Sequence, residues 1–142
     1  MNLHQFNLLL RSMRTTMNYL ILGGAGFIGV NFAAYFASKG HAVMLADNLS
    51  RRGSEANLAW IRQLHPSVSF AYCDVRDANE TARLFLQYPE VDVVIHLAGQ
   101  VAVTCSVTDP RHDFATNALG TFNVLEGIRL AGIDPVVLFA ST

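Results

Sequence analysis

A glycine-rich turn near the start of the chain constrains its fold more than any other feature. The apolar run Tyr19–Leu22 leads directly into Gly23-Gly24-Ala25-Gly26-Phe27-Ile28-Gly29, and apolar residues then recur at helical spacing. A strand that turns over glycines into a helix leaves the first N–H groups of that helix unpaired, and the helix dipole makes this end positive. The pattern predicts a strand-turn-helix unit that seats the diphosphate group of a dinucleotide.

An acidic residue follows at the distance that a dinucleotide site needs. Asp47 ends the apolar run Ala42–Ala46 and lies 18 residues after Gly29. A carboxylate at the end of the second strand accepts hydrogen bonds from the adenosine ribose in such folds. The alternative is a glycine-rich turn that binds no ligand. It is the weaker interpretation, because the strand, the helix and the acidic residue all occur at the positions that a dinucleotide site requires.

The residues after Asp47 bear on the choice of dinucleotide. Arg51 and Arg52 could bind the 2′-phosphate of NADP, but the Asp47 carboxylate would repel that phosphate. The sequence therefore favours NAD as the cofactor.

Composition and charge narrow the class of protein. The chain has 142 residues, of which 51% are hydrophobic, which suits the core of one domain. Its formal net charge of −1 gives no reason to expect binding to nucleic acid or to a membrane. Cys73 and Cys105 form no CxxC pair, so we expect two packed thiols and a cytoplasmic protein. With no second ligand at metal spacing, we expect no metal site and a structural role for His96.

Residues 1–16 precede the first strand and stand apart from the domain, which we expect to span 17–142. They contain Arg11 and Arg14 but no acidic residue, and the apolar stretch Leu8–Leu10 is too short for a membrane span or a signal sequence. We expect a disordered extension, or a true start at Met17. A targeting peptide is the weaker alternative.

Beyond the glycine turn, the chain alternates strands and helices as a doubly wound parallel α/β fold does. The predicted strands are Tyr19–Leu22, Ala42–Asp47, Val68–Cys73, Val91–Leu97 and Pro135–Ala140. The predicted helices are Phe27–Lys39, Glu55–His65, Asp77–Leu86, which starts with a capping box of Asp77 and Glu80, and Asp113–Ala131. We therefore expect a Rossmann-type sheet that stops after about its fifth strand, with that strand as an exposed edge.

Several short motifs occur together at the predicted carboxyl ends of the strands, where ligands bind in such sheets. They are Gly23 to Gly29, Asp47-Asn48-Leu49-Ser50-Arg51, Asp74-Val75-Arg76-Asp77, His96-Leu97-Ala98-Gly99, Asn117 with Gly120-Thr121, and Ser141-Thr142. In this combination, the chain from about Tyr19 onward resembles the NAD-dependent epimerase/dehydratase family, the extended short-chain dehydrogenases. Within the family it is most similar to enzymes that invert C2 of a CDP-linked sugar, because Gly53, Asn57-Leu58 and Gly99-Gln100-Val101-Ala102 also match.

The resemblance implies a role for each matching residue. The residues implied to contact NAD are Gly23, Gly26, Phe27, Ile28 and Gly29 at the pyrophosphate, Asp47, Asn48, Ser50 and Arg51 around the adenosine ribose, Asp74 and Val75 beside the adenine, and Leu97, Ala98 and Gln100 on the nicotinamide side. Asn117 is implied to stabilise this end of the sheet. Thr142 is implied to be the catalytic hydroxyl that hydrogen-bonds the reacting sugar oxygen.

The catalytic Tyr and Lys of the family, in a YxxxK motif after the last predicted strand, have no counterpart there. Tyr35 and Lys39 have the spacing, but they fall in the first helix, which we expect to place them on its packed side behind the glycine turn. We interpret this match as chance. We expect the chain to be the N-terminal portion of an epimerase, without the catalytic helix and the sugar-nucleotide lobe, and inactive alone.

By the same resemblance, the intact enzyme would be a homo-oligomer that takes a nucleotide sugar, oxidises it transiently to a keto sugar with bound NAD and returns the hydride to the opposite face. Two alternatives stay open. One is a related enzyme of the UDP-glucose 4-epimerase or dTDP-glucose 4,6-dehydratase type. The other is a non-catalytic module that binds a dinucleotide as a sensor or scaffold.

Overall fold

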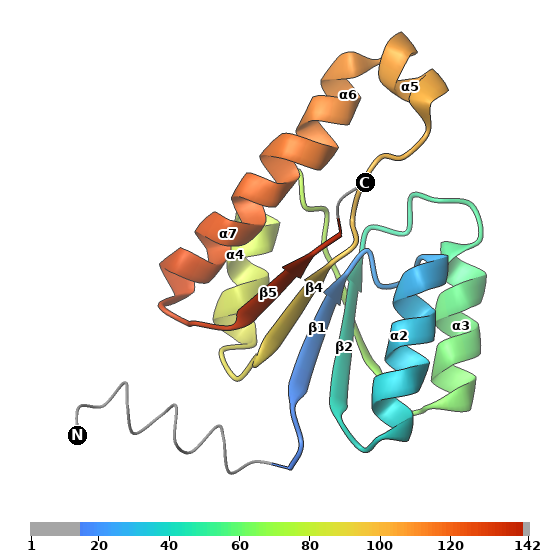
Figure 1. Ribbon diagram of the computed structural model, residues 1–142, viewed down its shortest axis with the longest axis vertical. Helices are drawn as coiled ribbons and strands as arrows, with labels where there is room; N and C mark the ends of the chain where they lie inside the picture. The colour runs from blue at the N-terminus through green and yellow to red at the C-terminus, as the bar shows by residue number, and fades with distance from the viewer. Residues whose placement is uncertain (1–14, 141–142) are drawn as a thin grey trace.

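Five parallel strands form a single sheet in the order β3-β2-β1-β4-β5 (Figure 1). The computed structural model describes residues 15–140. The strands are β1 (Asn18–Leu22), β2 (Ala42–Asp47), β3 (Ser69–Tyr72), β4 (Val93–His96) and β5 (Val136–Phe139). The predicted doubly wound α/β fold is confirmed. Because the strand order reverses direction on either side of β1, a crevice opens beside the carboxyl end of this strand.

Helices cover both faces of the sheet. They are α2 (Phe27–Ser38), α3 (Ser54–Leu64), α4 (Ala78–Gln87), α5 (Val103–Thr108), α6 (Pro110–Phe114) and α7 (Gly120–Ala131). Figure 1 shows α2 and α3 on one side of the strands and α4 and α7 on the other. Each layer encloses its own half of the core.

The central strand β1 supplies both halves of that core. Leu20 and Leu22 point toward Phe85 of α4 and Val124 of α7, whereas Ile21 packs with the α2 and α3 layer. All five side chains are fully buried. A parallel strand that is covered on both faces must be apolar at every position, which explains why the strand before the glycine turn has no polar alternation.

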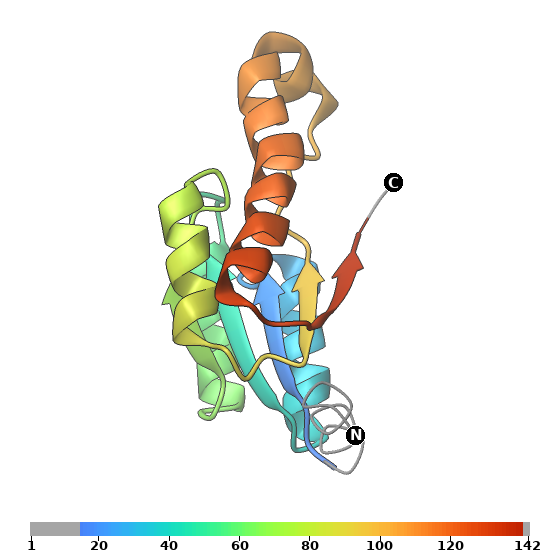
Figure 2. The same ribbon diagram turned by 90° about the vertical axis from the view of Figure 1, so that its left-hand side faces the viewer.

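The region after β4 differs most from the prediction. The predicted long helix is present but begins at Pro110, because the Asp109 side chain accepts a hydrogen bond from the His112 N–H (3.0 Å) and caps it. A π-helical turn, η1 (Ala115–Leu119), joins α6 to α7, and the rod that they form rises past the carboxyl ends of the strands (Figure 2). The short helix α5 lies in a segment for which no helix was predicted.

Apolar side chains are exposed along β5. Val136, Leu138 and Phe139 are each more than half exposed, and β5 pairs with β4 alone among the strands of residues 15–140. Within those residues no helix is both long and apolar enough to cross a bilayer. The predicted extension lies outside the described residues except for Thr15 and Thr16.

We expect the 142-residue chain to associate through the β5 edge as its concentration rises, because unpaired main-chain groups there adjoin apolar side chains. Leu138→Lys places a charge on this edge and should weaken the association. Leu64→Lys, at a similarly exposed leucine of α3, is the matched control. Sedimentation velocity over a concentration series measures the effect, and a wild-type chain that stays monomeric throughout would contradict it.

Candidate functional site

The turn between β1 and α2 is built so tightly that it needs glycine. Gly23 has a φ of +73°, and a Cβ on it would lie 2.6 Å from the Ala98 nitrogen. A Cβ on Gly29 would lie 2.7 Å from the Gly24 Cα. Gly26 is different, since a Cβ there would meet only the Gly23 oxygen, at 3.1 Å. Gly23 and Gly29 are therefore required by the fold, whereas Gly26 leaves room on the side that faces the cavity.

The first turn of α2 carries main-chain donors without acceptors. Gly26 is the N-cap and has no side-chain cap. Among residues 15–140, none accepts a hydrogen bond from the N–H groups of Phe27, Ile28 or Gly29. These donors and the positive end of the helix dipole make this turn attractive to an anion.

Asp47 connects the end of β2 to this turn. Its Oδ2 accepts a hydrogen bond from the Ala25 N–H (3.0 Å), and its Oδ1 accepts one from the Leu49 N–H (2.8 Å). Leu49 has a φ of +54°, an uncommon conformation for leucine that this hydrogen bond helps to hold. Each carboxylate oxygen keeps a lone pair for another donor.

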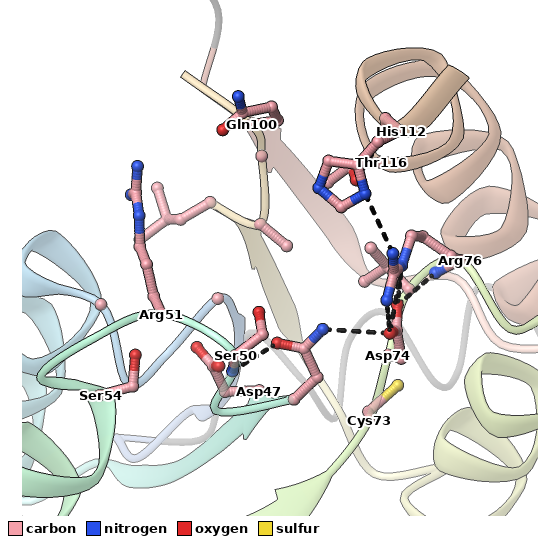
Figure 3. A pocket seen from close by; sticks show the side chains of 17 residues that line it. Asp47, Ser50, Arg51, Ser54, Cys73, Asp74, Arg76, Gln100, His112 and Thr116 are labelled. Carbon is pink, nitrogen blue, oxygen red and sulfur yellow. Dashed lines mark hydrogen bonds and ion pairs between the residues drawn. The ribbon is translucent and has the colours of Figure 1, made fainter. Parts of the chain in front are cut away.

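The turn after β3 presents a second carboxylate that is already neutralised. Asp74 accepts hydrogen bonds from Arg76 Nε (2.9 Å to Oδ1) and Nη2 and from Asn48 Nδ2 (3.1 Å). The Arg76 guanidinium holds the pKa of Asp74 well below its usual range. Figure 3 shows Arg76 between Asp74 and His112, whose Nδ1 accepts from Arg76 Nη1 (3.1 Å). Arg76 thus forms an ion pair within this turn and joins the turn to α6 by a hydrogen bond.

Glu80 also contributes to this turn. The predicted capping box is half correct: Asp77 caps α4 by accepting from the N–H groups of Asn79 and Glu80. The Glu80 carboxylate does not return to Asp77 but accepts from the Asp74 N–H (2.8 Å). It therefore orients the residue that carries the second carboxylate.

The opposite wall is the loop after β4, and Asn117 holds it from the π-helical turn. Asn117 Oδ1 accepts from the Gln100 N–H (2.8 Å), and Asn117 Nδ2 donates to the Gln100 carbonyl (3.0 Å). This paired contact fixes Gln100 without placing Asn117 on the cavity surface. Asn117 therefore connects the loop after β4 to the π-helical turn.

These walls enclose a cavity of about 430 Å³. Its lining includes Gly23, Gly26, Asp47, Asn48, Ser50, Arg51, Asp74, Val75, Leu97, Ala98 and Gln100, all of them predicted (Figure 3). Phe27, Ile28 and Gly29 do not line it and face it only through the end of α2, and Thr142 lies outside the described residues. The lining also includes Arg76 and Gly99, which belong to the predicted motifs at the strand ends but had no predicted role, and Ser54, Cys73, His112 and Thr116, which were not predicted. The spacing of His112 and Thr116, four residues apart, could have indicated a shared helix face.

His96 is the last residue of β4 and is buried against α7, beneath this site. The Thr121 hydroxyl donates its only hydrogen to the Asn117 carbonyl (2.7 Å), so it accepts from His96 Nε2 (3.1 Å). The proton is thereby assigned to Nε2, and Nδ1 has no partner among residues 15–140. Burial lowers the pKa of His96 to about 4. The side chain is neutral and has no metal-binding partners, since the described residues contain no metal-ligating cluster.

Two further expectations need correction. Cys73 is packed, and burial raises its pKa to about 11, but Cys105 is exposed because it lies on α5, which has no buried residue. Tyr35 is 58% exposed and not on the packed side of α2, where Ala33 is buried instead. The Lys39 Nζ lies 5.8 Å from the centre of the Tyr35 ring, at the end of α2 remote from the cavity.

The chain is similar to proteins that act on nucleotide sugars. The family model described as GDP-mannose 4,6 dehydratase matches residues 20–142. CDP-paratose 2-epimerase from Salmonella typhi is 40% identical over 126 residues, which are 89% of this chain and 37% of that protein. A dTDP-glucose 4,6-dehydratase from Mycobacterium tuberculosis is 33% identical over 120 residues, 82% of this chain and 34% of that protein.

Solved structures of nucleotide-sugar epimerases also match this chain. UDP-glucose 4-epimerase from Bifidobacterium longum, in complex with NAD+ and UDP, matches with a TM-score of 0.80 and 30% identity, over 89% of this chain and 37% of that one. The chain therefore spans well under half the length of the proteins it matches.

The lowered pKa of His96 predicts acid sensitivity. The folded state binds this proton less readily than the unfolded state, in which the pKa of the side chain is near 6.5. The contribution of His96 to stability therefore falls as the pH drops from about 6.5 to about 4, and this contribution changes no further below about 4. Between about pH 7.5 and about pH 5, we expect His96 to cost about 2 kcal/mol of unfolding free energy.

Urea unfolding at the two pH values measures this cost. His96→Gln, whose amide can still donate toward Thr121 but does not titrate, should show a pH dependence smaller by that amount. Equal losses in the wild type and the variant would contradict the assignment.

Proposed function

The chain belongs to the NAD-dependent epimerase/dehydratase family, and we propose from this that its cavity binds NAD. The observation that carries the proposal is the set of free N–H groups at the start of α2, which opens beside the cavity that Asp47 and Asp74 line. The B. longum epimerase, which matches 89% of this chain, was crystallised with NAD+.

The residues present fit this cofactor. Its diphosphate would meet the N–H groups of Phe27, Ile28 and Gly29, and the missing Cβ of Gly26 leaves it room. The free lone pairs of Asp47 suit ribose hydroxyls, with Asn48, Ser50 and Arg51 nearby. We assign Asp74 and Val75 to the adenine, Leu97, Ala98 and Gln100 to the nicotinamide, and Gly23, Gly29 and Asn117 to the framework of the site. NAD supplies a hydride acceptor, and in reduced form a hydride donor.

We propose CDP-paratose 2-epimerase as the activity of the complete enzyme. The support is the 40% identity to the Salmonella enzyme, together with the matching run Asp47 to Arg51 and the loop Gly99-Gln100-Val101-Ala102. The M. tuberculosis dehydratase and the B. longum epimerase share the same fold region, so an enzyme acting on a dTDP-sugar or UDP-sugar is the second candidate. A non-catalytic NAD sensor is the third.

This chain's own residues would bind and orient the reactants. A hydroxyl at Thr142 would donate to the sugar oxygen on which charge develops, an electrostatic role. The substrate would be a nucleotide sugar, and the complete enzyme would be a homo-oligomer. The two cysteines are free thiols, which supports the cytoplasm as the compartment.

NAD binding tests the first proposal. We expect Gly26→Val, which fills the cavity side of the turn, and Asp47→Ala, which removes the ribose acceptor and the tie to Ala25, each to weaken NAD binding by about tenfold or more. Glu55→Ala, on the exposed side of α3, is the control. Isothermal titration calorimetry measures the affinities, and unchanged binding in both site variants would contradict the proposal.

Turnover tests the assignment of the catalytic parts. We expect the 142-residue chain to bind NAD but to convert neither CDP-paratose, UDP-glucose nor dTDP-glucose, because Tyr35 and Lys39 are its sole YxxxK match and are exposed on α2. Product analysis by liquid chromatography would detect conversion. Turnover of any of the three sugars by this chain would overturn the expectation and identify the substrate.

A further inference from the structure

One side chain contacts the glycine turn from outside the cavity. Asn57, in the first turns of α3, donates from Nδ2 to the main-chain carbonyl of Ala25 (2.9 Å). The main-chain N–H of Asn57 donates to the Gly53 carbonyl (2.9 Å), as expected within α3. The side-chain amide is thus not needed for the helix itself and can donate to the glycine turn. Asn57 is half-buried and does not line the cavity.

The carbonyl that Asn57 occupies has a natural competitor. In an α-helix, the N–H of each residue bonds the carbonyl four residues earlier, and for Gly29 that carbonyl belongs to Ala25. Ala25 is fully buried, so its oxygen needs a donor. If Asn57 did not supply one, α2 could extend backwards by bonding the Gly29 N–H to Ala25, and the end of the helix would lose one of its free donors.

The main-chain N–H groups in the middle of the turn are already paired. The Ala25 N–H donates to Asp47 Oδ2 (3.0 Å), and the Gly26 N–H donates to the Gly23 carbonyl (3.1 Å). The donor that the Ala25 carbonyl binds therefore decides whether the Gly29 N–H stays free.

We propose that Asn57 is a positioning residue of the diphosphate seat, which holds the Ala25 carbonyl and so keeps the Gly29 N–H available to an anion. The proposal rests on the proposed binding of NAD. An amide suits the task because it donates without charge. A carboxylate at position 57 would present an acceptor to the carbonyl and repel a phosphate.

Two variants and a control test the role. Asn57→Ala removes the donor, and Asn57→Asp keeps the shape but cannot donate when ionised. Gln63→Ala truncates an exposed amide on the same helix and is the matched control. We expect both Asn57 variants to bind NAD and ADP about tenfold more weakly, with adenosine, which lacks the diphosphate, changed by less than about twofold. Calorimetry measures the three affinities.

Amide hydrogen exchange in the ligand-free chain gives a readout that general destabilisation would move the other way. In Asn57→Ala, we expect the Gly29 amide to exchange about fivefold more slowly, because it gains the Ala25 acceptor. A merely structural role would make exchange faster. Faster or unchanged Gly29 exchange in both variants overturns the proposal, as does an equal loss of adenosine affinity. If the wild-type chain binds neither NAD nor ADP, the proposed function fails, while slower Gly29 exchange would still support the hold of Asn57 on Ala25.

Discussion

The end of β2 builds the site that the rest of the structure surrounds. The Ala46 carbonyl accepts two hydrogen bonds, from the N–H groups of Gly23 (2.9 Å) and Gly24 (3.1 Å), and Asp47 then binds Ala25. Two consecutive residues of one strand thus set the path of the turn that leaves the neighbouring strand. The helix that follows can start with free donors only because this turn is held from the side and not by the helix itself.

The two carboxylates at the cavity do not cancel the attraction of the α2 N-terminus for an anion. Arg76 neutralises the charge of Asp74, and each carboxylate oxygen of Asp47 accepts a hydrogen bond from a main-chain N–H group. Neither carboxylate is an isolated negative charge. A ligand with a negative centre and neutral hydroxyl groups is therefore better matched to this cavity than a cation or an apolar molecule.

Local patterns in the sequence predicted the sheet and most of the cavity, since strands, glycines and Asp47 are signals within short stretches of chain. Contacts between residues far apart in the sequence could not be predicted from such local patterns. The donation of Asn57 to Ala25 joins positions 32 residues apart, and the contact of Arg76 with His112 joins positions 36 apart. The helix α5 was missed because its Val, Thr and Ser residues favour strands or loops as much as helices. Exposure of Tyr35 shows that apolar spacing along α2 did not fix which side is buried.

The π-helical turn makes the rod above the sheet sensitive to length. A π-turn holds one residue more than the α-helical turn it replaces, which rotates everything on one side of it by about 100° around the helix axis. Deleting a single residue from η1 would leave α7 seated on the sheet but swing Asp113 and the ring of His112 away from their partners Ser106 and Arg76. An insertion elsewhere on the rod would do the same in the opposite sense, so the number of residues in this segment is as much a part of the site as their identity.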